Sequence, residues 1–114
     1  MARRHWKAPN DPTRQARQVW SALFPSEPWP KGWRVRWAGF MRGAAGLTIY
    51  AERRVILSWG DARRRGAETK QWGAVDTLLH EFVHVRCGHQ LRHGQEFARL
   101  ENALRAKLGL EPRP

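Results

Sequence analysis

The sequence predicts a small α+β domain in which one helix precedes a three-stranded, mainly antiparallel sheet and two more helices follow it. Three observations support this prediction: a helical apolar period at residues 13–24, an apolar period of two from Trp33, and a second helical stretch from residue 71. With 114 residues, 41% of them hydrophobic, the chain can fill one compact core. We therefore expect a single domain at residues 11–114 after a basic, flexible arm at residues 1–10.

The first helix is expected to begin at Asp11-Pro12, because aspartate caps helix N-termini and proline is accepted in the first turn. It should continue through TRQARQVWSALF, residues 13–24. Three prolines then predict an extended linker, SEPWPKG, at residues 26–32. The apolar side chains of the helix form one stripe that we expect to be buried: Ala16, Val19, Trp20, Leu23 and Phe24.

Three short strands should follow the linker. WRVRWAGF alternates apolar residues with arginine, as a half-buried strand does, whereas VILSW reads as a buried strand. LTIYA lies between them, and the tripeptide ERR can form a tight turn before VILSW. We therefore expect an antiparallel meander and, after it, a polar connection. The strands are expected at residues 33–40, 47–51 and 55–59, and the connection at residues 60–70.

Helical periodicity returns for the last third of the chain. One helix is expected from about Gln71 to Gly88, a loop at residues 89–94, and a final helix at residues 96–110. The first of these helices should bury Trp72, Val75, Leu79, Phe82 and Val83, and the second Phe97, Leu100, Ala103, Leu104 and Leu108.

The chain is strongly basic: 21 Lys and Arg against 10 Asp and Glu leave a formal charge of +11. Most of these cations are arginine, which pairs with phosphate in a bidentate fork, so we expect nucleic acid as a partner. A solvated, Arg-rich surface is the simpler alternative. Trp33 and Trp37 can either stack on bases or form the core face of their strand. The candidate phosphate contacts are Arg34, Arg36, Arg63, Arg64 and Arg65.

No apolar run approaches the roughly 18–20 residues that cross a bilayer. The N-terminus is basic but lacks the apolar segment of a secretory signal. The single cysteine, Cys87, excludes an internal disulfide and fits a reducing compartment. We therefore expect a soluble, cytoplasmic protein without a membrane partner.

A candidate metal site lies in the segment LHEFVHVRCGHQLRHGQEF. On a helix, His80 and His84 are one turn apart on one face, so both imidazoles can reach one ion. Glu81 points away from that face and is free to accept a proton from water. Such HExxH matches also occur by chance, but here further histidines follow closely. Spacing alone leaves four candidates for the third ligand: His89, His93, Glu96 and Glu101.

HEFVH followed by HGQEF resembles the SprT-like zinc metalloproteases, which include the bacterial SprT and eukaryotic Spartan proteases. AGLTIYAERRVILSW is similar to the strands before the HExxH helix in that family, so the resemblance covers about residues 13–108. It implies a minimal zincin fold, zinc held by His80, His84 and His93, Glu81 as catalytic base, and a peptide substrate along the sheet edge. The chain resembles a short form, with a short loop between the motifs and no zinc ribbon.

Four other residues are weaker candidates. Asp76 can orient His80 through its second ring nitrogen, and Tyr50 or Arg92 can stabilise an oxyanion. Cys87 is expected to be a small buried residue.

The resulting hypothesis is a zinc-dependent peptidase acting on DNA-associated proteins. Two alternatives remain open: a basic nucleic-acid-binding module with a structural metal site, and a zincin peptidase that cleaves a specific regulatory protein such as a repressor.

Overall fold

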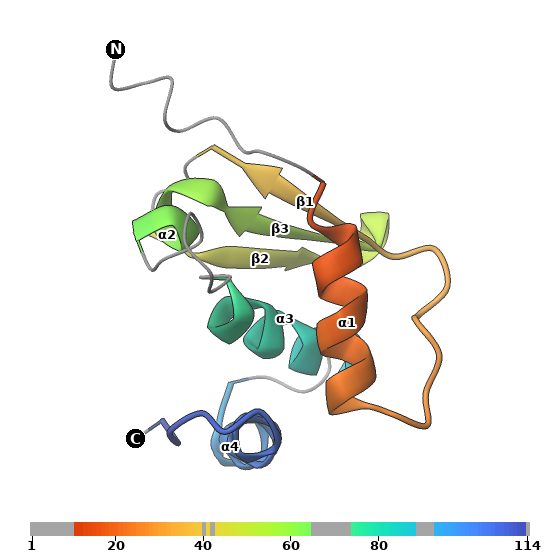
Figure 1. Cartoon of the computed structure of the whole chain (residues 1–114), viewed down its shortest axis with the longest axis vertical. Helices are drawn as coiled ribbons and strands as arrows, with labels where there is room; N and C mark the ends of the chain where they lie inside the picture. Colours follow the sequence, from red (N-terminus) through yellow and green to blue (C-terminus); the bar gives the residue numbers. More distant parts are fainter. Residues whose placement is uncertain (1–10, 40, 42, 65–73, 89–92, 114) are drawn as a thin grey trace.

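A computed structural model describes residues 11–39, 41, 43–64, 74–88 and 93–113, without the side chains of residues 61, 63 and 64. The arm expected at residues 1–10 lies outside the described residues. The small α+β fold is confirmed (Figure 1). Its elements are α1 (Thr13–Leu23), β1 (Arg34–Ala38), β2 (Gly46–Ile49), a 3-10 turn (Tyr50–Glu52), β3 (Arg54–Ser58), α2 (Trp59–Arg64), α3 (Val75–Cys87) and α4 (Gln95–Lys107).

The sheet has three strands in the order β1-β3-β2, so the predicted meander is wrong. β3 pairs parallel with β1, with Val55 opposite Val35, and antiparallel with β2, with Val55 opposite Thr48. β3 is the most buried of the three strands. Because it lies in the centre of the sheet, its backbone is paired along both edges. Residues 39–53, which include β2, are long enough to return the chain parallel to β1. The expected turn at ERR is present, with Arg53 in the left-handed region at φ 51°.

Helix α3 lies between the sheet and α4, and α1 crosses beside both β1 and α3 (Figure 1). The aromatic rings of Trp20 in α1 and Phe82 in α3 meet edge to face with centroids 5.2 Å apart. Three residues of the predicted α1 stripe are buried: Ala16, Trp20 and Leu23. Val19 and Phe24 are half-buried against the same core. The helix begins one residue later than expected, and Asp11 Oδ1 accepts a hydrogen bond from the Thr13 amide at 2.9 Å.

The buried face of α4 differs from the prediction. Phe97 and Leu104 are buried and Leu108 is half-buried, but Leu100 and Ala103 are exposed. Two charged residues, Glu101 and Arg105, occupy buried positions instead. They turn inward because each pairs with a polar side chain of α3: Glu101 with His80, and Arg105 with Asp76.

Two element boundaries also differ. The third strand ends at Ser58, and Trp59 begins the short helix α2 where a strand end and an irregular connection were expected. The described part of α3 begins at Val75, while Trp72 lies outside the described residues. Within the part of the chain that the structure describes, no helix is long and apolar enough to span a membrane.

Candidate metal centre

The HEFVH motif lies in the middle of α3, whose position is set by its buried apolar face. Leu78, Leu79, Phe82 and Val83 pack into the core and hold the helix against the sheet and α4. His80 and His84 follow one turn apart at the edge of that face, with ring centroids 5.2 Å apart. Two imidazoles therefore project from a rigid element toward one point.

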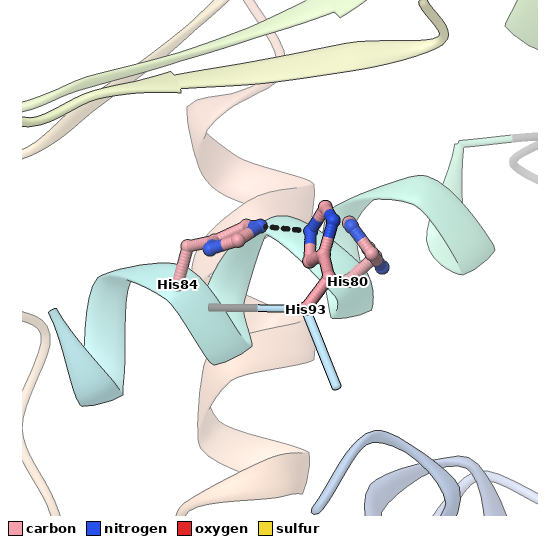
Figure 2. Close-up of side chains that lie close together, drawn as sticks. All are labelled: His80, His84 and His93. Atoms are coloured by element: carbon pink, nitrogen blue, oxygen red, sulfur yellow. Dashed lines mark hydrogen bonds between the residues drawn. The ribbon is translucent and has the colours of Figure 1, made fainter. Parts of the chain in front are cut away.

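His93, from the segment before α4, joins this pair (Figure 2). Its Nε2 lies 2.9 Å from Nε2 of His84, and its ring centroid lies 5.0 Å from that of His80. One nitrogen from each of the three histidines lies within 4.8 Å of the others, and this is a group that could hold a metal ion. Among the three candidate third ligands that the structure describes, His93 joins the pair, whereas Glu96 and Glu101 do not. His89 lies outside the described residues.

Phe97 forms the base of the histidine cluster. It is only 2% exposed, and its ring centroid lies 4.9, 4.6 and 4.8 Å from those of His80, His84 and His93. The sequence predicted Phe97 only as a core residue of the last helix. Because one rigid ring contacts all three imidazoles, it restricts their rotation and keeps the cluster preorganised.

The second ring nitrogen of His80 is held by Glu101 of α4. His80 Nδ1 lies 2.8 Å from Glu101 Oε2, and the carboxylate accepts, so Nδ1 carries the proton. The lone pair of Nε2 is then available to a metal, as in carboxylate–histidine–metal arrangements. Glu101 is one of the candidate direct ligands, but its carboxylate contacts Nδ1 of His80, on the side of the ring opposite the nitrogen that would bind the metal. Asp76, which was a candidate for orienting His80, pairs with Arg105, and Glu101 is the carboxylate that contacts His80 Nδ1.

The donor set fits zinc. Burial, assisted by the neighbouring His80 and His93, lowers the pKa of His84 to about 4, so its ring is neutral and can donate a lone pair near pH 7. Zinc binds imidazole nitrogen at about 2.0–2.1 Å in a tetrahedron, which separates ligand nitrogens by about 3.3 Å. Three such ligands would leave one tetrahedral position open.

Glu81 projects from α3 toward β2, and its carboxyl is close enough to His80 and His93 to interact with them electrostatically. It is 6% exposed, and the Thr48 hydroxyl of β2 donates to its Oε1 at 2.7 Å. Burial raises the pKa of the Glu81 carboxyl, and the hydrogen bond from Thr48 opposes part of that rise. β2 can approach this closely because residue 46 is glycine: a Cβ there would lie 3.2 Å from Glu81 Cγ. No sequence pattern pointed to Thr48.

The remaining candidates are spread around the cluster. Tyr50 is adjacent, with its ring centroid 6.5 Å from that of His84, and burial followed by the nearby charge of Glu81 raises its pKa. Glu96 is exposed and pairs with Arg99 at 3.2 Å, away from the histidines. Cys87 was expected to be buried, but it is half-buried at the end of α3. Arg92 lies outside the described residues.

The predicted phosphate contacts are placed only in part. Arg34 and Arg36 are exposed on β1, and Arg36 pairs with Asp11 at 2.6 Å. The side chains of Arg63 and Arg64, and the whole of Arg65, lie outside the described residues. Of the two tryptophans, Trp37 packs edge to face on Trp59 with centroids 5.1 Å apart, as the core interpretation requires.

Comparison with models of protein families, with curated proteins and with solved structures returned no match. The resemblance to SprT-like metalloproteases therefore stays a prediction, carried by HEFVH, HGQEF and the strand segment before them.

Proposed function

We propose that the chain is a zinc-dependent metallopeptidase that hydrolyses peptide bonds in proteins associated with DNA. The observation that carries the proposal is the convergence of His80, His84 and His93 beside a buried glutamate, Glu81. Glu101 supports it, because an orienting carboxylate on the second ring nitrogen is typical of histidine that binds a metal.

The three imidazoles would hold the ion through His80 Nε2, His84 Nε2 and His93 Nε2. Bound there, zinc would supply Lewis acidity to a water molecule and to the scissile carbonyl group. The neutral state of His84, whose pKa burial lowers to about 4, keeps this donor set available at neutral pH.

Glu81 is the general base in this proposal. Thr48 donates to its Oε1, which leaves Oε2 to accept the proton of the attacking water and later return it to the leaving amine. Burial raises the pKa of the Glu81 carboxyl, and a raised pKa makes its carboxylate a stronger base. In this proposal the buried Glu81 carboxyl transfers the proton, and the three histidines hold the metal.

Tyr50 and β2 are suited to the substrate. The Tyr50 hydroxyl is a phenol that is protonated at neutral pH, and burial raises its pKa further. It is buried in this structure, so its donation to the developing oxyanion would require the substrate to open the contacts that cover it. β2 is an edge strand of the sheet and carries Thr48. An extended peptide that pairs with this edge passes the Glu81 side of α3.

The decisive experiment compares wild-type protein with Glu81→Gln. Zinc content is measured on purified protein, and cleavage of an unfolded protein substrate is followed by mass spectrometry with and without chelator. Glu81→Gln should retain zinc and lose about 10²–10⁴-fold in cleavage rate. Glu96→Gln, an exposed change of the same kind, should keep both properties. Undiminished cleavage by Glu81→Gln would exclude this mechanism.

A closed structural metal site is the main rival, and it needs a fourth protein ligand. The cluster found among the described residues has three members. His93→Ala should therefore lower zinc affinity sharply, whereas His89→Ala should leave it unchanged. Loss of zinc on changing His89 would favour the structural site and a nucleic-acid-binding role without catalysis.

A further inference from the structure

A second concave site lies apart from the histidine cluster, where the start of α1 faces β1 and the linker before it. It is a cleft of about 380 Å³, the size range of small-ligand pockets. The residues that matter for its chemistry are three arginines, two tryptophans and one aspartate: Arg17, Arg34, Arg36, Trp29, Trp33 and Asp11.

The cleft carries positive charge that is only partly compensated. Asp11 pairs with Arg36 at 2.6 Å, and its pKa is lowered mainly by hydrogen bonds from Thr13, so it is ionised. Arg34 forms no ion pair with any described residue. Arg17 lies over the Trp29 ring, 5.4 Å from its centroid, and no carboxylate within the described ranges pairs with it. Two exposed guanidinium groups therefore face one cleft without a carboxylate partner.

The tryptophans give the cleft a preorganised aromatic wall. Trp29 Nε1 donates to the Trp33 carbonyl at 3.2 Å, which fixes the linker between them. The Trp29 ring packs edge to face on Phe82 of the core, with centroids 5.8 Å apart. Trp33 packs edge to face on Tyr50 and remains only half-buried. Rigid aromatic faces next to arginines are the features that bind unpaired bases and the phosphates between them.

We propose that this cleft binds single-stranded nucleic acid, with phosphates on Arg17 and Arg34 and a base on the face of Trp33. An acidic peptide would satisfy the arginines but would make no use of the aromatic wall. A duplex keeps its bases stacked inside the helix, so it offers phosphates but no free base to Trp33. The combination of charge and aromatic surface therefore favours a single strand.

The cleft and the histidine cluster are neighbours. Trp33 contacts Tyr50 at a centroid distance of 6.3 Å, and Tyr50 contacts His84 at 6.5 Å. A strand held in the cleft would lie beside the proposed catalytic residues. The inference deepens the proposed function and rests on it for its biological meaning, since it explains how a peptidase would reach proteins on DNA. Binding itself requires neither zinc nor Glu81.

The test is fluorescence anisotropy of a labelled oligothymidine of about 12 nucleotides with the full chain, at several salt concentrations. The double variant Arg17→Gln/Arg34→Gln should weaken binding by roughly tenfold and reduce the salt slope by about 0.7 for each lost phosphate contact. The matched control is Arg86→Gln/Arg99→Gln, which removes the same charge from two exposed arginines that do not line the cleft. It should retain binding close to wild type.

Asp11→Asn provides the opposite change. The amide oxygen can still accept from the Thr13 amide, but Arg36 loses its counter-charge, so binding should tighten by about threefold. Trp33→Leu should weaken binding while leaving the salt slope unchanged, because it removes stacking and no charge.

Three outcomes would overturn the inference: equal loss of binding in the control and cleft double variants, tighter binding of duplex than of single strand, or displacement of the oligonucleotide by polyglutamate. Binding is measured on chelator-treated and zinc-loaded protein, and we expect it in both. Failure of the peptidase proposal appears separately, as cleavage that survives Glu81→Gln, so the two proposals can fail independently.

Discussion

Glu101 Oε2 lies 2.8 Å from His80 Nδ1 and so joins α4 to the HEFVH helix through the second nitrogen of a proposed metal ligand. The Glu101 side chain is 7% exposed, and Arg113 approaches the same oxygen at 3.5 Å. A buried carboxylate in the apolar face of a helix is costly unless it is paired. The contact explains both the burial of Glu101 and the orientation of His80.

Glu101→Gln should weaken zinc binding by about 10–100-fold, because the amide keeps the volume but loses the charge that strengthens and orients the imidazole. The affinity is measured by competition with a chromophoric chelator. Glu96→Gln, on the exposed side of the same helix, serves as control and should bind zinc like wild type. Equal affinity in both variants would show that Glu101 is only structural.

Thr48→Val should move the acid limb of the pH–rate profile to higher pH. The Thr48 hydroxyl lowers the pKa of Glu81, and its removal lets burial raise that pKa further. A base with a higher pKa is ionised only at higher pH, which sets the direction of the shift. Thr48→Ser keeps a hydroxyl at this position and should restore the wild-type profile. An unshifted profile in Thr48→Val would mean that this limb does not report Glu81.

Gly46→Ala should destabilise the domain by about 1–3 kcal/mol and reduce cleavage. A Cβ at residue 46 would lie 2.6 Å from Thr77 Cγ2 and 3.2 Å from Glu81 Cγ, so β2 must move away from α3. Gly39→Ala is the matched control, because a Cβ there meets nothing within 4 Å. Urea denaturation of the two variants measures the difference, and similar midpoints would contradict the close approach.

The metal-free protein should lose stability as pH falls from about 6.5 to about 4. The pKa of His84 is 6.5 in its ordinary state and about 4 when folded, so the unfolded chain takes up the proton first. Its stabilising contribution is present above pH 6.5 and is lost on acidification. Because the ring is half-exposed, solvent screening reduces the effect to about 1–2 kcal/mol.

This pH dependence is best measured by denaturation in the Glu81→Gln background. The buried Glu81 carboxyl has a raised pKa, so its contribution has the opposite sign and declines as pH rises. Adding His84→Gln should flatten the curve between pH 4 and 6.5. A slope that persists without His84 would assign the effect to other groups.

The sequence predicted the type of most elements because their apolar periods are local. Trp20 and Leu23 in α1, and Phe82 and Val83 in α3, are buried as their spacing indicated. The apolar period identifies the buried face of an element but does not determine which other element packs or pairs against it. The sheet order was therefore missed: β3 lies between β1 and β2, where its backbone is paired on both edges. Leu100 was misplaced for a related reason, since the polar partners of Glu101 and Arg105 on α3 decided which face of α4 turns inward.

The sequence by itself determined the pairing of His80 with His84, because one helical turn places both side chains on the same face whatever the surrounding fold. It also determined that Glu81 points elsewhere. Only the tertiary structure showed that His93 joins the pair and that Glu101 contacts the second ring nitrogen of His80. His93, Glu101 and Thr48 come from different parts of the chain, and they reach α3 through the packing of α4 and β2. Such contacts depend on how separate elements bury their apolar faces together, and no local spacing encodes them.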